Sequence, residues 1–96
     1  MPPSSVTFVM IARIPPEGVS TFATYEDHVL PLLAEHGGVL QRRLRSGDGL
    51  VEIHVLNFPS PAARARFRED PRRLQYAPEL EASGARIEVL QLEDVI

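Results

Sequence analysis

The sequence predicts an α+β domain whose elements follow the order β-α-β-β-α-β. Three observations support this prediction. The chain has 96 residues, which is a usual length for one domain. Runs of β-branched and apolar residues are interleaved with segments of helical periodicity. Proline and glycine residues stand between these segments, where they end strands and helices.

The first strand is predicted over residues 5–14 and ends at Pro15-Pro16, because proline cannot donate to a strand ladder. A helix follows, with Ser20 as its expected N-cap. Its apolar stripe contains Phe22, Tyr25, Val29, Leu33 and His36. Pro31 removes a backbone donor inside this helix, so we expect a kink there or a break near Leu30.

Residues 39–45 and 50–58 are predicted to form the next two strands, joined as a hairpin. Asp48-Gly49 between them fits a tight primed turn. Three arginines lie in the first of these strands, and such charges are typical of an exposed sheet edge.

The second helical region begins at Pro61, with Ser60 as its cap. Asp70-Pro71 should interrupt it, since the residue before a proline disfavours helix. We expect a further helical piece over residues 71–83, and the last strand over residues 86–94. The side chains expected to face inward from this piece are Leu74, Ala77 and Leu80.

Short right-handed crossovers fold this order into the ferredoxin-like arrangement. It is a four-stranded antiparallel sheet with both helices on one face and the first and third strands in the centre. Both central strands are apolar on both sides, so the uncovered face would be apolar too. We therefore predict a sheet-to-sheet homodimer with two-fold symmetry. Cover from the ends of the chain is the alternative.

Composition and charge exclude several classes of protein. Hydrophobic residues make up 44% of the chain and charged residues 24%, which is typical of a globular domain and argues against disorder. The net charge of −3 argues against a nucleic-acid partner. The absence of cysteine excludes disulfides and thiolate metal sites. No apolar run approaches the roughly 20 residues of a membrane span, and no secretory signal is visible, so we expect a cytoplasmic protein without a membrane partner.

Several local patterns resemble the dimeric α+β barrel superfamily over about residues 5–95. They are Tyr25, Val29, Pro31, Leu32-Leu33, His36-Gly37-Gly38 and the segment from Val55 to Ser60 with its Phe-Pro-Ser sequence. Within the superfamily they resemble a branch related to the antibiotic-biosynthesis-monooxygenase-like proteins. The resemblance implies that residues 1–96 form a single α+β barrel domain. The superfamily includes cofactor-independent monooxygenases and lactone isomerases, so the fold constrains the function only weakly.

Two ionisable residues, Glu52 and His54, lie two positions apart on a central strand and therefore share a face. Buried charge is costly unless it is paired, so these residues need a reason to be there. One interpretation makes His54 a general base and Glu52 a ligand-binding residue. The other is a cross-strand polar pair with Arg13 or Arg43 in the dimer contact, and both arginines are also ligand-binding candidates.

Tyr25 and His36 flank the expected kink, where they could line a small pocket. Tyr25 is the second candidate catalytic residue and His36 a candidate for ligand binding. Alternatively, their polar tips reach water at the edge of the core. Asn57 is a further ligand-binding candidate. The resembled branch commonly has glutamate at this position, so this chain departs from the branch there, and a catalytic role of that acid in relatives does not carry over to Asn57.

Arginines are concentrated in the second helical region, where they form a solvated helix face or an anion-binding rim. They are Arg64, Arg66, Arg68, Arg72 and Arg73. No closely spaced histidine or carboxylate pattern matches a metal motif, so we expect neither a metal nor a cofactor.

Three functions remain open. The first is binding of a small, partly apolar molecule between the helices and the sheet. The second is a cofactor-independent monooxygenase or isomerase, with His54 or Tyr25 as the acid or base. The third is a structural or stress-related dimer without a ligand.

Overall fold

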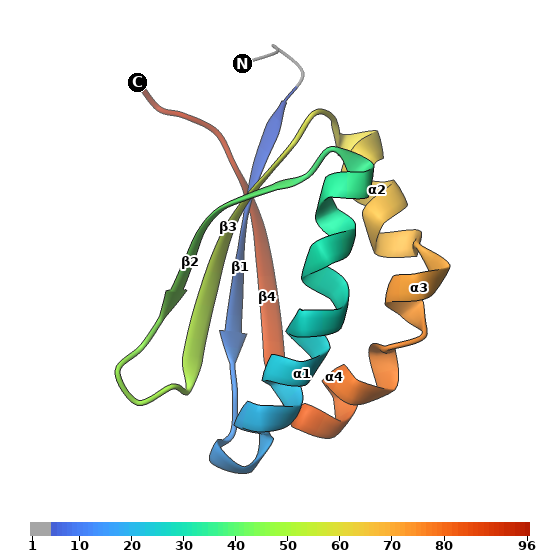
Figure 1. Ribbon diagram of the computed structural model, residues 1–96. Coiled ribbons are helices and arrows are strands. Elements are labelled where there is room, and N and C mark those ends of the chain that lie inside the picture. The colour runs from blue at the N-terminus through green and yellow to red at the C-terminus, as the bar shows by residue number, and fades with distance from the viewer. Residues whose placement is uncertain (1–4) are drawn as a thin grey trace.

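The computed structural model describes residues 5–96 as a four-stranded antiparallel sheet with the helices on one face (Figure 1). The strand order is β2-β3-β1-β4, so the first and third strands are central, as predicted. The elements are β1 (Val6–Arg13), the 3₁₀ helix η1 (Pro16–Gly18), α1 (Val19–Val29), the 3₁₀ helix η2 (Leu30–His36), β2 (Val39–Arg45), β3 (Val51–Phe58), α2 (Pro61–Glu69), α3 (Pro71–Leu74), α4 (Ala77–Ser83) and β4 (Arg86–Leu92). This is the ferredoxin-like α+β fold.

The core lies between the sheet and the helices in two clusters. One contains Phe8, Leu33, Phe58 and Ala63. The other contains Met10, Ala12, Ile14 and Phe22. Successive strand residues point to opposite faces, so the buried even-numbered residues of β1 fix which side faces the helices.

The first helical region breaks at the proline, as expected. The α-helix ends at Val29, and Leu30 to His36 continue as a 3₁₀ helix with Pro31 in its first turn. Gly37 has a φ of 73°, the left-handed conformation that ends the segment. The change of helix type accommodates the missing proline N–H without a long unpaired stretch.

The expected N-cap of α2 is confirmed, and the expected N-cap of α1 is wrong. Ser60 caps α2, because its side chain accepts a hydrogen bond from the Ala63 amide at 3.1 Å. Ser20 as an N-cap is wrong: α1 starts at Val19, directly after η1, and has no side-chain cap. The preceding 3₁₀ turn already leads the backbone into the helix.

The hairpin loop is wider than the predicted primed turn. The Gly49 amide donates to the Ser46 carbonyl at 3.0 Å, and the Ser46 amide to the Val51 carbonyl at 2.9 Å. Only Gly49 in this loop has a positive φ, whereas the predicted turn requires one at Asp48 as well. The Asp48 side chain instead accepts from the Leu50 amide at 3.0 Å.

The region after Pro71 consists of two short helices, α3 and α4, rather than one piece over 71–83. Asp70 begins α3 by accepting a hydrogen bond from the Arg72 amide at 2.8 Å. Leu74 and Ala77 are exposed, contrary to prediction, because the break between the two helices turns them away from the core. Leu80 is partly buried against the second core cluster.

The sheet face opposite the helices carries apolar side chains without a covering layer in the chain described. The domain is only 17 Å thick along its shortest axis, as expected for two layers. Leu44, Leu90 and Leu92 are each about two-fifths exposed on this face. Their neighbours there include Val9, Ile11, Ile53 and Val55. None of the helices in residues 5–96 is long and apolar enough to cross a membrane.

Candidate functional site

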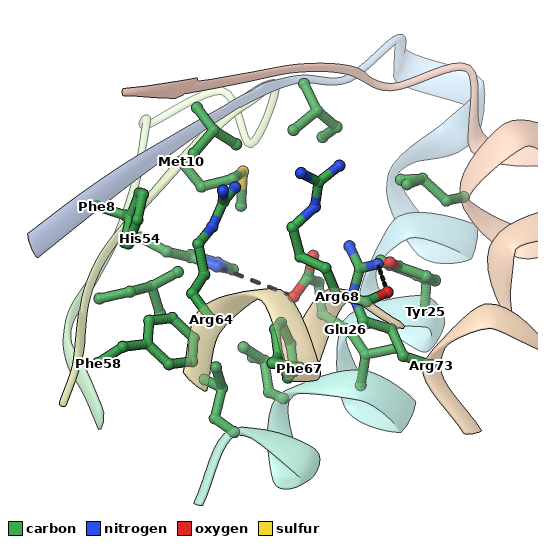
Figure 2. Close-up of a pocket in the computed structure, with 17 residues that line it drawn as sticks. Phe8, Met10, Tyr25, Glu26, His54, Phe58, Arg64, Phe67, Arg68 and Arg73 are labelled. Carbon is green, nitrogen blue, oxygen red and sulfur yellow. Dashed lines mark hydrogen bonds and ion pairs between the residues drawn. The ribbon is translucent and has the colours of Figure 1, made fainter. Parts of the chain in front are cut away.

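A cavity of about 220 Å³ lies between the helices and the sheet. Its apolar wall comes from β1, β3, α1, η2 and α2, and it includes the rings of Phe8, Phe58 and Phe67. Figure 2 shows Phe8 and Phe58 beside His54 at one end of the cavity, and Glu26, Tyr25 and Arg73 toward the other end. The helix break at Val29 and Leu30 is part of this wall, since both residues line the cavity.

Glu26, His54 and Tyr25 bring polar atoms to the cavity (Figure 2). All three residues are at most 4% exposed. Glu26 and Tyr25 come from α1, and His54 comes from the central strand β3. The Glu26 Oε2 and His54 Nδ1 atoms are 3.9 Å apart. A buried carboxyl group and a buried imidazole therefore face one another inside an aromatic cavity.

Glu52 lies behind His54 and fixes its ring. His54 Nε2 is 2.7 Å from Glu52 Oε1, so an ionised Glu52 accepts the Nε2 hydrogen and leaves the Nδ1 lone pair toward Glu26. Arg43 and Arg45 on the edge strand also donate to the Glu52 carboxylate, at 2.5 Å and 3.1 Å. Glu52 is buried but is balanced by three partners. It thus acts as an anchor outside the cavity wall.

The surroundings shift the pKa values of Glu26 and Glu52 in opposite directions. Burial, together with the nearby Glu52 charge, raises the pKa of Glu26 from 4.5 to about 7. Burial also acts to raise the pKa of Glu52, but hydrogen bonds from His54 and Arg43 outweigh it and hold that pKa below its ordinary value. Glu52 is therefore the stable anion, and Glu26 is the group that gains and loses a proton near neutral pH.

Burial shifts the pKa values of His54 and Tyr25 in opposite directions, and in both cases it favours the neutral side chain. Burial lowers the pKa of His54, against the opposing effect of its Glu52 hydrogen bond, and thus favours the neutral imidazole. Burial raises the pKa of Tyr25, so its hydroxyl remains protonated and can donate a hydrogen bond. The site combines a proton acceptor, a neutral imidazole and a hydroxyl donor.

Three arginines, which we call the arginine rim, line the same cavity: Arg64, Arg68 and Arg73. The Arg64 guanidinium lies over the Phe8 ring at 4.3 Å, and that of Arg73 over the Phe67 ring at 5.3 Å. Figure 2 shows the three side chains entering the cavity region from α2 and α3. The sequence left open whether these arginines form a solvated face or an anion-binding rim, and three of them line the cavity.

The structure brings some predicted residues together and separates others. His54 and Tyr25 line the cavity, with Glu52 and Arg43 directly behind His54. The alternative of a cross-strand polar pair with Arg43 is confirmed in its partner, because Arg43 donates to Glu52. Its location between two sheets is wrong, because Glu52 and His54 lie on the helix-covered face. The apolar residues on both sides of this strand gave no signal for its orientation.

Arg13, Asn57 and His36 lie outside the cavity wall. Arg13 forms an exposed ion pair with Glu88 at 3.4 Å. The Asn57 side-chain amide donates to the Val6 carbonyl at 3.1 Å. These contacts give both residues a structural role, and neither residue touches the group around His54.

His36 ties the end of η2 to the junction of α2 and α3. Its Nε2 atom is 2.8 Å from Asp70 Oδ2, and Arg72 donates to the same oxygen at 2.8 Å. Arg72 also pairs with Glu35 at 2.8 Å. Hydrogen bonds from Arg72 and His36 hold the pKa of Asp70 well below its usual range. This network positions the helices that carry the arginine rim.

The sequence analysis missed Glu26, although a signal was present. Glu26 follows Phe22 by four residues and precedes Val29 by three, so it falls within the apolar stripe of α1. A carboxyl residue in such a stripe is unexpected, and that spacing could have identified it. No cluster of three or more metal-binding side chains occurs in the part of the chain that the structure describes.

Comparison with solved structures gives the same fold in several bacterial proteins. SnoaB, described as a cofactor-independent oxygenase from Streptomyces nogalater, has a TM-score of 0.81 and 20% identity over 97% of this chain and 95% of its own. The protein Rv0793 from Mycobacterium tuberculosis has a TM-score of 0.73 and 21% identity over 97% of this chain and 100% of its own. An antibiotic biosynthesis monooxygenase has a TM-score of 0.77 and 16% identity over 95% of this chain and 99% of its own.

The chain shares the ferredoxin-like fold of the antibiotic biosynthesis monooxygenases. At these identities the likeness concerns the fold. No protein-family model matches the sequence, and no curated protein is a significant match. The functional argument therefore depends on the residues of the cavity.

Proposed function

We propose that this protein binds a small hydroxylated aromatic molecule in the cavity and removes its hydroxyl proton, as the first step of a cofactor-independent oxygenation. The observation that carries the proposal is the position of Glu26 and His54, both buried, facing one another within an aromatic wall. The fold likeness to SnoaB, a cofactor-independent oxygenase, supports the reaction type. Simple binding without chemistry is the other function that the cavity supports.

The size of the cavity limits the ring system. An engineered protein cavity of about 150 Å³ holds benzene. The cavity here measures about 220 Å³, which fits one or two fused rings, with larger substituents extending toward solvent. Phe8, Phe58 and Phe67 provide the apolar and aromatic contacts that such rings need.

The proposed chemistry begins with Glu26 in its ionised form. Glu26 takes the hydroxyl proton, and the resulting aromatic anion is a better electron donor to O₂ than the neutral molecule. One oxygen atom bonds to a ring carbon as a hydroperoxide, and loss of water then leaves a hydroxyquinone. For 1,4-dihydroxynaphthalene the products are 2-hydroxy-1,4-naphthoquinone and one water molecule, so O₂ accepts all the electrons that the ring loses.

The test is turnover of 1,4-dihydroxynaphthalene under ¹⁸O₂. We expect protein-dependent 2-hydroxy-1,4-naphthoquinone with one labelled oxygen atom, measured by mass spectrometry. Unassisted oxidation gives instead the unsubstituted quinone and hydrogen peroxide, and a catalase-coupled oxygen electrode measures this background. If the protein binds the quinol but adds no label to the product, the oxygenase proposal is wrong and the binding function remains.

We further propose that two copies associate through the open sheet face. Its centre is apolar, including Val9, Ile53 and Val55 on the two central strands, while Arg42 and Glu88 lie on the edge strands β2 and β4. An apolar centre with a polar border is typical of an interface. A second copy of the same face supplies a matching surface, since a two-fold contact needs only one self-complementary patch.

Sedimentation at micromolar concentration is expected to give twice the chain mass of 10.7 kDa. Replacing Ile53 by Arg places a charge at the centre of the open face and should produce a folded monomer. Arg42→Gln at the border is the matched control and should leave the dimer intact. A wild-type chain that sediments as a monomer would contradict this proposal. The cytoplasmic location stays a prediction.

A further inference from the structure

The arginine rim carries positive charge that has no partner among the described residues. Arg13, Arg43, Arg45 and Arg72 form ion pairs with carboxylates. Among the described residues the other six arginines form no such pair, and of these only Arg64, Arg68 and Arg73 line the cavity. The adjacent carboxylate of Asp70 is already occupied by Arg72 and His36. In the part of the chain that the structure describes, three guanidinium groups without a carboxylate partner therefore lie at one cavity.

The helix geometry explains why these three side chains meet. Arg64 and Arg68 are four residues apart on α2 and so lie on the same side of that helix. Asp70 ends α2 and starts α3, which turns the chain and brings Arg73 back beside them. The Arg73 Nη1 atom donates to the Arg68 carbonyl at 3.2 Å, and this bond holds the Arg73 side chain in place.

Arg73 also has an unused donor. Its Nε atom is buried and has no hydrogen-bond partner in the part of the chain described. A buried donor without a partner costs free energy, so such groups are rare unless something else binds them. The charged form of Arg64 is disfavoured by its surroundings, because burial and the charges of Arg68 and Arg73 lower its pKa. The Nε atom lies beneath the cavity surface, so the mutual repulsion of the three guanidinium groups that line the cavity is the feature that favours an anion here.

We infer that the molecule bound in the cavity is an aromatic carboxylate, with its rings against the rest of the apolar lining, which includes Leu33, Leu56 and Phe58, and its carboxylate on the arginine rim. This inference rests on the proposed function, since it specifies the molecule that enters the same cavity. A carboxylate accepts paired hydrogen bonds from a guanidinium group in one plane. The guanidinium groups of Arg64 and Arg73 already lie over the Phe8 and Phe67 rings, so the positive charge stands directly beside the apolar lining that would hold the rings of the acid.

Calorimetric titration with matched naphthalene probes tests the inference. The probes are 2-naphthoate, the neutral 2-naphthamide and 2-naphthyl phosphate. We expect 2-naphthoate to bind the wild-type protein at least about tenfold more tightly than 2-naphthamide, which corresponds to one charge-assisted hydrogen bond. This preference should weaken as the salt concentration rises.

Single-residue variants test whether the arginine rim causes the preference for 2-naphthoate. Arg73→Gln and, separately, Arg64→Gln should reduce the preference for 2-naphthoate to within about threefold, while binding of 2-naphthamide is retained. Arg66→Gln is the matched control, because Arg66 lies on α2 but does not line the cavity. It should keep the full preference. Thermal melting of each variant verifies that it is folded.

Several results would overturn the inference. Equal binding of 2-naphthoate and 2-naphthamide would mean that the rim does not select an anion, although the cavity would still bind an aromatic molecule. Tighter binding of 2-naphthyl phosphate, by about tenfold or more, would replace the carboxylate by a phosphate ester. Equal losses in Arg66→Gln and Arg73→Gln would assign the effect to general charge. Failure of all three probes to bind would contradict the proposed function itself.

Discussion

Replacing Glu26 by Gln should reduce turnover of 1,4-dihydroxynaphthalene by about 10² to 10⁴-fold, the usual contribution of a general base. Glutamine keeps the shape of the side chain but cannot accept the proton. Binding of 2-naphthamide should change little, because the aromatic wall is intact. Asp27→Asn is the matched control, since Asp27 is the exposed neighbour of Glu26 on α1 and does not line the cavity. An active Glu26→Gln variant would exclude Glu26 as the base.

The pH dependence gives a second measurement on the same variant. Burial raises the pKa of Glu26 to about 7, so the fraction of ionised base, and with it the rate, should rise as the pH passes through about 7. The ordinary value is 4.5, and folding therefore favours the protonated form. As the pH rises from below 4.5 to above 7, the wild-type protein should lose about 3 kcal/mol of unfolding free energy relative to Glu26→Gln. Denaturant unfolding across this range measures the loss, and parallel curves for the two proteins would contradict it.

Replacing Glu52 by Gln should destabilise the protein by about 2 kcal/mol at neutral pH. Breaking a buried ion pair costs about 3–5 kcal/mol when the partner charge stays buried. Here the side chains of Arg43 and Arg45 are 31% and 55% exposed and can be hydrated, so the expected cost is smaller. Glu88→Gln removes the exposed partner of Arg13 and should change stability by less than about 0.5 kcal/mol.

The stability difference between wild type and Glu52→Gln should depend on pH in the opposite direction to that of Glu26. Hydrogen bonds from His54 and Arg43 outweigh burial and hold the pKa of Glu52 below its ordinary value of 4.5. The stabilisation by Glu52 is therefore fully present above 4.5 and is lost as the pH falls through the folded-state pKa. Unfolding midpoints that differ equally at pH 7 and in acid would show that the loss comes from packing rather than from charge.

The sequence predicted the strands well because their limits are set by local chemistry. Pro15-Pro16 ends β1, and the cap of Ser60 starts α2, without help from distant residues. It could not orient β3, because the strand is apolar on both sides of its two ionisable residues. Which side carries Glu52 and His54 is decided by the packing of β3 against its neighbours. That packing is a long-range property.

The candidate site was harder to predict from the sequence than the strands were, because its residues meet through long-range contacts. Tyr25 and His54 were found because polar groups in apolar segments are conspicuous. Glu26 stands in an equally apolar helix stripe, so its spacing from Phe22 and Val29 carries the same kind of signal. The role of Arg73 depends on the turn at Asp70, which places one arginine beside two others from a different helix. A linear pattern shows the concentration of charge but not its convergence.

The positions of the two tyrosines allow ligand binding to be followed by the intrinsic fluorescence of the protein. The chain has no tryptophan, so its intrinsic ultraviolet fluorescence comes from Tyr25 and Tyr76. Tyr25 borders the cavity, whereas Tyr76 does not and stacks on the His28 ring with centroids 4.2 Å apart. A bound aromatic molecule that absorbs at longer wavelength will quench the nearer fluorophore first. Occupancy can therefore be followed in the unlabelled protein, with Tyr25→Phe identifying the share of the signal that belongs to the cavity.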